Sequence, residues 1–556
     1  MTTTPTTRSL GAILVLLVLW TAMQCVWLDL DERIVEGDVM GNVGAVELFR
    51  IDRWKLSVTE VLTRSYLEDY GEYPALYPAL MGIGLAAIDS TDLNGDTPAL
   101  VGLAWSWLAV LSTWALGWAL AGPRVAWWGA TLLLLSPLWA GMQRHVLLEN
   151  GVVALVALTA AASIHALRAR QVHHHRAALG SWAAAGLTAG LALLVKQTAA
   201  LALFPILVVA TLGGRGVGRW REALAGPCLC VATAGALAAP WYLRHGASHD
   251  AYLTRSLQAN PDAVGPLHQL AYYPLVLLQL PYAPAALLAC GLLALHARRT
   301  PEPPPDDQPW LRWARVGLPF AAALGGIALL MLLPKKYPRL LVPLLPLITV
   351  GFAVHVLRWP RLHRALVLSV LGASLIASSF QLGPVSSALG VTRVGLVDVD
   401  ERCFQSWVEP PSRPGLDWDD LLATLERAGL AKTAYRVGAS KWPVPPCSHQ
   451  TTHDLGQHLR IRARRAGLKT RVLAGEDAWE IAGQWTEGPP SILLSDGPDP
   501  CQHDPAACEG LGEPILVKRF PDPPPGWPID LHLFRVSDQP KAATGDQPVH
   551  TGAPAP

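Results

Sequence analysis

Long apolar runs separated by short polar connections extend from the N-terminus to about residue 386, and the pattern then becomes that of an ordinary water-soluble chain. A helix that crosses the hydrocarbon core of a bilayer needs about 20 predominantly apolar residues. Eleven runs fit this requirement well enough to be predicted spans: 10–28, 98–121, 124–142, 148–167, 181–195, 197–213, 223–243, 273–297, 315–333, 339–357 and 364–386. We therefore predict an all-α polytopic membrane domain over residues 1–386.

The basic residues of the short loops predict how this domain is oriented. Lysine and arginine are retained on the cytoplasmic side. Four connections are basic, at 168–176, 215–221, 296–315 and 358–364. If all four are cytoplasmic, the N-terminus is cytoplasmic too, and the apolar stretch 73–90 is a juxtamembrane or re-entrant segment within a first external loop, 29–97. Eleven spans then place the C-terminal domain outside the cytoplasm.

The region after residue 386 has the alternating pattern of a soluble α/β domain, predicted over 387–538. Helical periodicity recurs at 416–430 and 454–468, and candidate strands lie in TAYRVGA, TRVLAG, PSILLSDG, PILVKRF and DLHLFRV. The polar end, 539–556, is predicted to be disordered. Four cysteines of this domain permit disulfides in an oxidising compartment, with their pairing open: Cys403, Cys447, Cys501 and Cys508. A zinc site at Cys501, Cys508 and His503 is the alternative, although its spacing matches no standard zinc pattern.

Composition agrees with a membrane protein and disfavours one class of partner. Charged residues make up 16% of the chain, against about 25% in soluble proteins. The formal net charge is only +1, which argues against a nucleic-acid partner.

The polar residues with chemical potential gather on the predicted outer face. They are the acidic loop that follows the first span, the segment from Arg144 to Glu149, Lys196, and the basic turn 335–339. Such a group suits a reaction at a lipid phosphate, since lysine and arginine bind phosphate and a carboxylate can take a proton from an attacking group. No metal or other cofactor is required, because the cations themselves stabilise the leaving phosphate.

Each of these residues also has a purely structural interpretation. The acidic loop is then a solvated charge run. Glu149 is a carboxylate that complements the start of a helix, and Lys196 is an interfacial lysine whose charged end reaches the water. The basic turn 335–339 is then an interfacial anchor.

Six segments, in this order, resemble a known family. They are EGDVMGNVGAVELF, YPALYPAL, SPLWAGMQRHVLLENGVVAL, GLTAGLALLVKQTAALALFP, APWYLRH and KKYPRLLVPLLPL. The chain is similar over most of residues 1–360 to the membrane glycosyltransferases of the GT-C fold, the superfamily of protein O-mannosyltransferases and lipid A aminoarabinose transferases. The region after residue 386 carries no motif of that family.

The resemblance implies an inverting glycosyltransferase that moves a hexose or pentose from a polyprenyl-phosphate donor. The acceptor stays open between a protein, a lipid A-like glycolipid and a polysaccharide lipid. The family's catalytic acid falls on Asp38, with Glu36 second and Asp31–Glu32 as a competing match, and the second acid falls on Glu149. The donor phosphate is then bound by residues from three segments: Lys196, Arg144, Lys335, Lys336, Tyr337 and Arg339.

Other functions remain in competition. A transporter or flippase of a lipid-linked substrate is the main alternative, although the chain shows no paired halves of the kind that transporters often have. A non-catalytic membrane anchor for the C-terminal domain is the second alternative. For the glycosyltransferase, the expected location is a bacterial inner membrane with a periplasmic active face.

Overall fold

The structure is a computed structural model. It describes continuous stretches at 5–30, 55–67, 73–88, 96–171, 174–215, 220–247, 309–333 and 338–357. It also describes scattered residues between 42 and 49, 250 and 274, and 361 and 369, and short strands between 393 and 535. The described helices belong to one compact unit and strands β3 to β6 to a second.

The first unit is a bundle of long apolar helices. Within the described residues, six helices are long and apolar enough to cross a membrane: Thr6–Val26, Pro98–Ala121, Leu148–Arg170, His175–Val195, Gln197–Gly214 and Ala223–Arg244. All six coincide with predicted spans, so the chain is a multi-pass membrane protein. The predicted spans 273–297 and 364–386 lie almost wholly outside the described residues, and the total of eleven stays a prediction.

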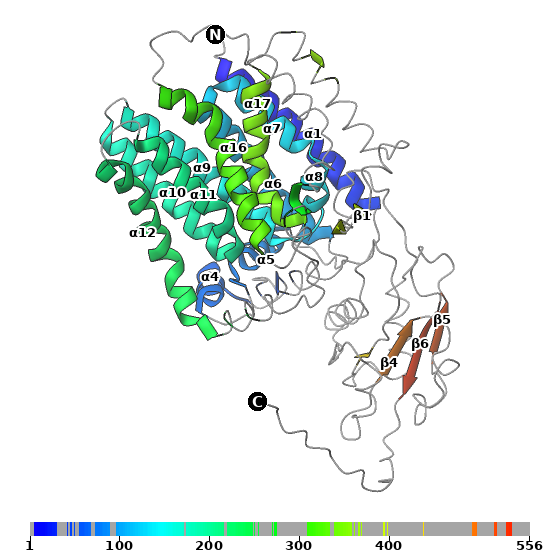
Figure 1. Ribbon diagram of the computed structural model, residues 1–556. Coiled ribbons are helices and arrows are strands. Elements are labelled where there is room, and N and C mark those ends of the chain that lie inside the picture. The colour runs from blue at the N-terminus through cyan, green and yellow to red at the C-terminus, as the bar shows by residue number, and fades with distance from the viewer. Residues whose placement is uncertain are drawn as a thin grey trace. The chain divides into compact units, whose positions relative to one another are not determined.

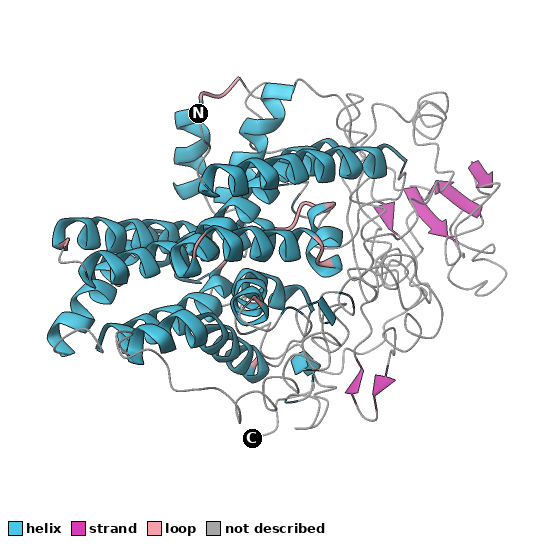
Figure 2. Cartoon of the chain, turned by 90° about the horizontal axis from the view of Figure 1, so that it is seen from above, coloured by secondary structure: helices cyan, strands magenta, loops and turns pink. Residues whose placement is uncertain are grey.

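The helices of this unit pack in a continuous series (Figures 1 and 2). Its members are α1 (Pro5–Leu30), α6 (Asp96–Ala121), α7 (Pro123–Leu134), α9 (Leu148–Gln171), α10 (His175–Val195), α11 (Ala200–Arg215), α12 (Trp220–Arg244), α16 (Pro309–Leu332) and α17 (Leu345–Val356). Helix α9 packs between α6 and α10, and α10 packs in turn on α12. Helix α11 packs on α16, and α17 lies against α7. Helix α9 is consequently the most enclosed span, with 78% of its apolar window buried.

The segment predicted as one span at 124–142 is divided in two. Helix α7 ends at Leu134, and a short helix α8 (Pro137–Gln143) follows it. Proline lacks an N–H and disfavours the helical conformation of the residue before it, and Ser136, which precedes Pro137, is indeed extended. The prediction of a single continuous helix is therefore wrong here, and its cause is Pro137.

Two short helices stand in the first external loop. Helix α4 (Val58–Leu67) begins with a capping box, in which the backbone N–H and the hydroxyl of Ser57 donate to Glu60 Oε2 at 2.7 and 2.8 Å, and the Glu60 N–H donates to Ser57 Oγ at 3.2 Å. Helix α5 (Leu76–Ile88) has 13 residues. At about 1.5 Å per residue it spans only about 20 Å, less than the apolar core of a bilayer, which agrees with the prediction that 73–90 does not cross.

The second unit contains a four-stranded sheet of order β3-β4-β6-β5. Its strands are β3 (Val437–Gly438), β4 (Ile492–Asp496), β5 (Leu516–Arg519) and β6 (Asp530–Arg535), and a separate two-stranded ladder, β1 (Arg393–Val394) with β2 (Val397–Asp398), precedes them. Strand β4 is parallel to β3 and antiparallel to β6, and β5 is antiparallel to β6. Strands β3 to β6 lie in four of the predicted strand stretches. The predicted helices at 416–430 and 454–468 lie outside the described residues.

Candidate functional site

Three charged side chains from three separate elements meet inside the helical unit. Lys196 Nζ lies 2.6 Å from Glu149 Oε1, and Arg339 Nε lies 3.7 Å from the same oxygen. All three are shielded from solvent, with exposed side-chain fractions of 6%, 2% and 13% for Lys196, Glu149 and Arg339. The sequence predicted all three as site residues, and the structure brings them together.

Glu149 occupies the first turn of α9, where the helix dipole favours a negative charge. The chain reaches this point through a tight turn, in which the Leu147 N–H donates to the carbonyl of His145 and the Asn150 N–H to that of Leu147. Glu149 therefore does complement the start of a helix, as the structural interpretation expects. That interpretation does not explain the two buried cations beside it, because a carboxylate at a helix start does not need them.

Lys196 connects α10 to the next span. Helix α10 ends at Val195, Lys196 is extended at φ −159° and ψ 130°, and the chain re-enters a helical conformation at η1 (Gln197–Ala199). The last turn of α10 is fixed by Leu194, which packs against Ala238 and Trp241 of α12. The ammonium group also lies 5.3 Å from the centroid of the Tyr73 ring, within the range of a cation–π contact. An interfacial lysine that reaches into water would be exposed, and Lys196 is not.

Arg339 belongs to η2 (Pro338–Leu344), the short helix that precedes α17. Its neighbours in the predicted basic turn, Lys335, Lys336 and Tyr337, lie outside the described residues. So do Asp38 and Glu36, the predicted base and its alternative. The structure therefore presents the predicted phosphate-binding face in part, and the roles of these five residues stay predictions.

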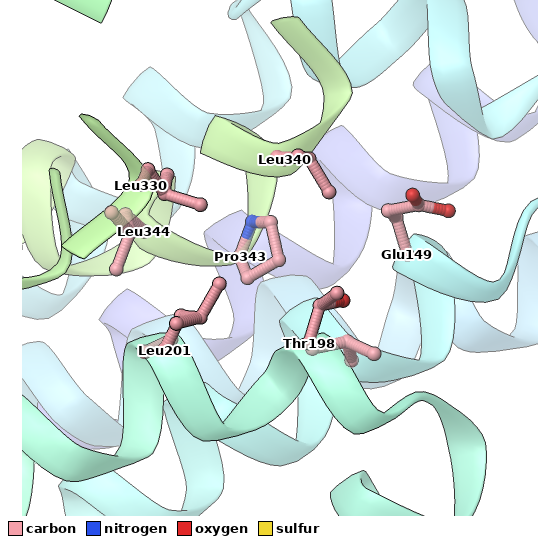
Figure 3. Close-up of a pocket in the computed structure, with 9 residues that line it drawn as sticks. Glu149, Thr198, Leu201, Leu330, Leu340, Pro343 and Leu344 are labelled. Carbon is pink, nitrogen blue, oxygen red and sulfur yellow. The ribbon is translucent and has the colours of Figure 1, made fainter. Parts of the chain in front are cut away.

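A pocket opens beside the charged cluster (Figure 3). It is lined by Glu149, Val152, Thr198, Leu201, Ala202, Leu330, Leu340, Pro343 and Leu344. In Figure 3, Glu149 stands at one end, and Leu201, Leu330 and Leu344 gather at the other. The pocket thus joins a charged end to an apolar interior, as expected for a ligand with an anionic head and a hydrocarbon tail.

A buried series of hydrogen-bonded neutral side chains fixes the turn that precedes Glu149. Ser106 donates to Gln143 Oε1, Gln143 Nε2 donates to Asn150 Oδ1 at 2.8 Å, and Asn150 Nδ2 donates to the backbone carbonyl of His145 at 3.0 Å. These bonds fix the turn that starts α9. None of these three side chains was predicted as a site residue, although Gln143 and Asn150 flank Arg144 and Glu149 in SPLWAGMQRHVLLENGVVAL.

Arg144 makes a different contact from the one expected. Its Nε donates to Gln24 Oε1 of α1 at 3.0 Å, and its side chain is buried. Among the described residues, the ion pairs of Glu149 are with Lys196 and Arg339. Arg144 therefore does not pair with Glu149, and binding of phosphate by Arg144 stays a prediction.

The electrostatic balance of the cluster favours an anion. Two cations surround one carboxylate, which leaves one net positive charge among the three side chains. Charges in a low-dielectric interior act more strongly than in water. Within the part of the chain that the structure describes, no group of three histidine, cysteine, aspartate or glutamate side chains is placed to hold a metal ion.

Fold and site together define a polytopic helical membrane protein with a mainly apolar pocket beside a buried cluster of two cations and one carboxylate. No family model matches the sequence, and no curated protein matches it.

Two solved structures share the fold over almost the whole chain. Both are of ArnT from Cupriavidus metallidurans, one bound to undecaprenyl phosphate and one in the apo state. The first has a TM-score of 0.56 at 16% identity and covers 96% of this chain and 99% of that one. The apo structure has a TM-score of 0.57 at 16% identity and covers 95% and 99%. The fold of this chain is thus that of ArnT.

Proposed function

We propose that this protein is an inverting membrane glycosyltransferase that moves a sugar from a polyprenyl-phosphate donor to an acceptor outside the cytoplasm. The observation that carries the proposal is the Glu149–Lys196–Arg339 cluster at the mouth of a mainly apolar pocket. The shared fold with ArnT bound to undecaprenyl phosphate supports it, since a polyprenyl phosphate has the anionic head and apolar tail that such a pocket suits.

In the proposed reaction, an acceptor nucleophile attacks the anomeric carbon from the face opposite the phosphate. The new bond forms there while the bond between the anomeric carbon and the phosphate oxygen breaks, and the anomeric configuration inverts. The leaving group is polyprenyl phosphate, whose growing negative charge Lys196 and Arg339 stabilise. Cations already held in place serve this role at little cost in reorganisation.

Glu149 has the role of placing the cations in this scheme. Its carboxylate holds Lys196 at 2.6 Å and Arg339 at 3.7 Å, and it is itself fixed by the first turn of α9. The proton of the nucleophile goes to a carboxylate of the first external loop. Asp38 is our choice for this base, with Glu36 second.

The experiment measures transfer of labelled sugar from synthetic polyprenyl-phosphate donors by the purified full chain in nanodiscs, with membrane extract as acceptor. Lys196→Gln is expected to lower the turnover by roughly 100- to 1,000-fold, the usual effect of removing one stabilising donor. Asp38→Asn is expected to abolish transfer and leave donor binding intact. The matched control is Lys55→Gln, because Lys55 is exposed in the same external loop.

Two results decide between this function and others. Full turnover by the Lys196→Gln protein would remove the cluster from the mechanism. Movement of a lipid-linked sugar across liposomes without transfer would favour a flippase. The proposal also includes a bacterial inner membrane, a cytoplasmic N-terminus, and a periplasmic α/β domain over 387–538.

A further inference from the structure

A second cluster of buried polar groups lies between α1 and α8, and the proposed reaction does not use it. The indole rings of Trp20 and Trp139 stack with their centroids 5.0 Å apart. Gln24 follows Trp20 by one helical turn and therefore lies on the same face of α1. Both helices are labelled side by side in Figure 1.

These three side chains carry hydrogen-bond donors that have no acceptor. Trp20 Nε1, Gln24 Nε2 and Trp139 Nε1 are buried and make no hydrogen bond. The side chains are 4%, 0% and 0% exposed. Buried N–H groups are almost always bonded, and leaving one unpaired costs free energy. Three in one contact between two helices indicate that something other than the chain supplies the acceptor.

The chemistry of the cluster selects an anion. All three unpaired groups are donors, so the ligand must present acceptor oxygens. The guanidinium group of Arg144 lies against the same glutamine, donating to Gln24 Oε1 at 3.0 Å, and brings a positive charge to the cluster. A phosphate group offers several acceptor oxygens and a negative charge, and hydrogen bonds to a charged partner are the strong ones.

The cluster lies on the buried face of α1, away from the exposed residues of that helix. Val18, Leu19 and Met23 are 55%, 62% and 40% exposed and lie on other faces of α1 than Trp20 and Gln24. The unpaired donors and the charge of Arg144 therefore define the chemistry of the ligand.

We propose that Trp20, Gln24 and Trp139 form a second anion-binding site, which takes a phosphate group, either from a lipid headgroup or free in solution. This site does not depend on the glycosyltransferase proposal, since it binds a phosphate whatever reaction the Glu149 cluster performs.

The decisive variant is Gln24→Glu. The carboxylate still accepts the hydrogen bond from Arg144, so the contact between α1 and α8 is kept, while the free amide donor is replaced by a negative charge. Native mass spectrometry of the full chain, released from phosphatidylcholine nanodiscs with added phosphatidic acid, counts the bound phosphatidic acid. We expect Gln24→Glu to lose one bound lipid. Trp139→Phe keeps an aromatic ring in the stack and removes one donor, and we expect the affinity to fall roughly tenfold.

The control is Trp118→Phe, because Trp118 is 41% exposed on a lipid-facing surface, and it should change nothing. Competition with inorganic phosphate identifies the source of the ligand: displacement shows that the phosphate alone is recognised, and no displacement shows that the lipid is needed. An unchanged count of bound lipid in Gln24→Glu, or an equal loss in Trp118→Phe, would overturn the inference. Neither measurement depends on sugar transfer, so a failure of this inference can be told apart from a failure of the proposed function.

Discussion

The two buried polar clusters of the helical unit differ in how their groups are satisfied. In the Glu149 cluster, one carboxylate is shared by two cations, and the described charges face one another. In the cluster of Trp20, Gln24 and Trp139, neutral donors are buried without an acceptor. The first cluster places both cations on one carboxylate and keeps one net positive charge, whereas the second has donors that only an added acceptor can satisfy. Both clusters can therefore take an anion, the first through its excess charge and the second through its unpaired donors.

The largest expected effect comes from breaking the ion pair. Glu149→Leu removes the carboxylate partner of the buried Lys196, and we expect a loss of about 3–5 kcal/mol in the free energy of unfolding. The double variant Glu149→Leu with Lys196→Met replaces the pair by apolar groups and is expected to be more stable than Glu149→Leu alone. Denaturation of the purified protein in detergent measures both. A double variant less stable than the single one would contradict this account of the cluster.

A smaller effect is expected behind the charged cluster. Asn150→Ala removes the side chain that accepts from Gln143 and donates to the carbonyl of His145. Leaving such buried groups unpaired costs about 1–3 kcal/mol. Because Asn150 fixes the turn before Glu149, its loss should also lower the turnover by changing kcat more than KM. A matched change in a span, Thr211→Ala, removes only a hydroxyl bonded to its own helix and should leave the kinetics unaltered.

The smallest effect on stability is expected at the start of α4, where the capping box of Ser57 and Glu60 is exposed. The backbone N–H of Ser57, followed by its hydroxyl, holds the pKa of Glu60 below its usual value. A carboxylate whose pKa is lowered by folding adds stability above its unfolded pKa and loses it as the pH falls through the folded pKa. Ser57→Ala should therefore lower the melting temperature slightly at neutral pH, and the difference should shrink toward acidic pH. A difference that grows on acidification would show that the capping box is not the source.

Charged residues inside apolar sequence were predictable, because a charge is expensive in the membrane and needs a reason. Glu149, Lys196 and Arg339 were found in this way. Gln24, Gln143 and Asn150 were not, since an amide in an apolar helix carries no charge and has no fixed spacing. Their importance depends on which helices pack together, and hydrophobic periodicity does not give that pairing. The described spans were predicted correctly, but the break before Pro137 was missed, because residues 124–142 form one continuous apolar run.

In the proposed reaction, the position of Glu149 between two cations would have a consequence for product release. A sugar-bearing polyprenyl phosphate is a diester with one negative charge, whereas the phosphate monoester left after transfer carries about −1.5 to −2 near neutral pH. Without Glu149, Lys196 and Arg339 would match the product better than the donor and would retain it. With Glu149 in place, the cluster has a single net positive charge, which matches the donor and leaves the product in excess. The carboxylate thus favours exchange of spent lipid for a new donor, and turnover follows from the same contact that holds the cations.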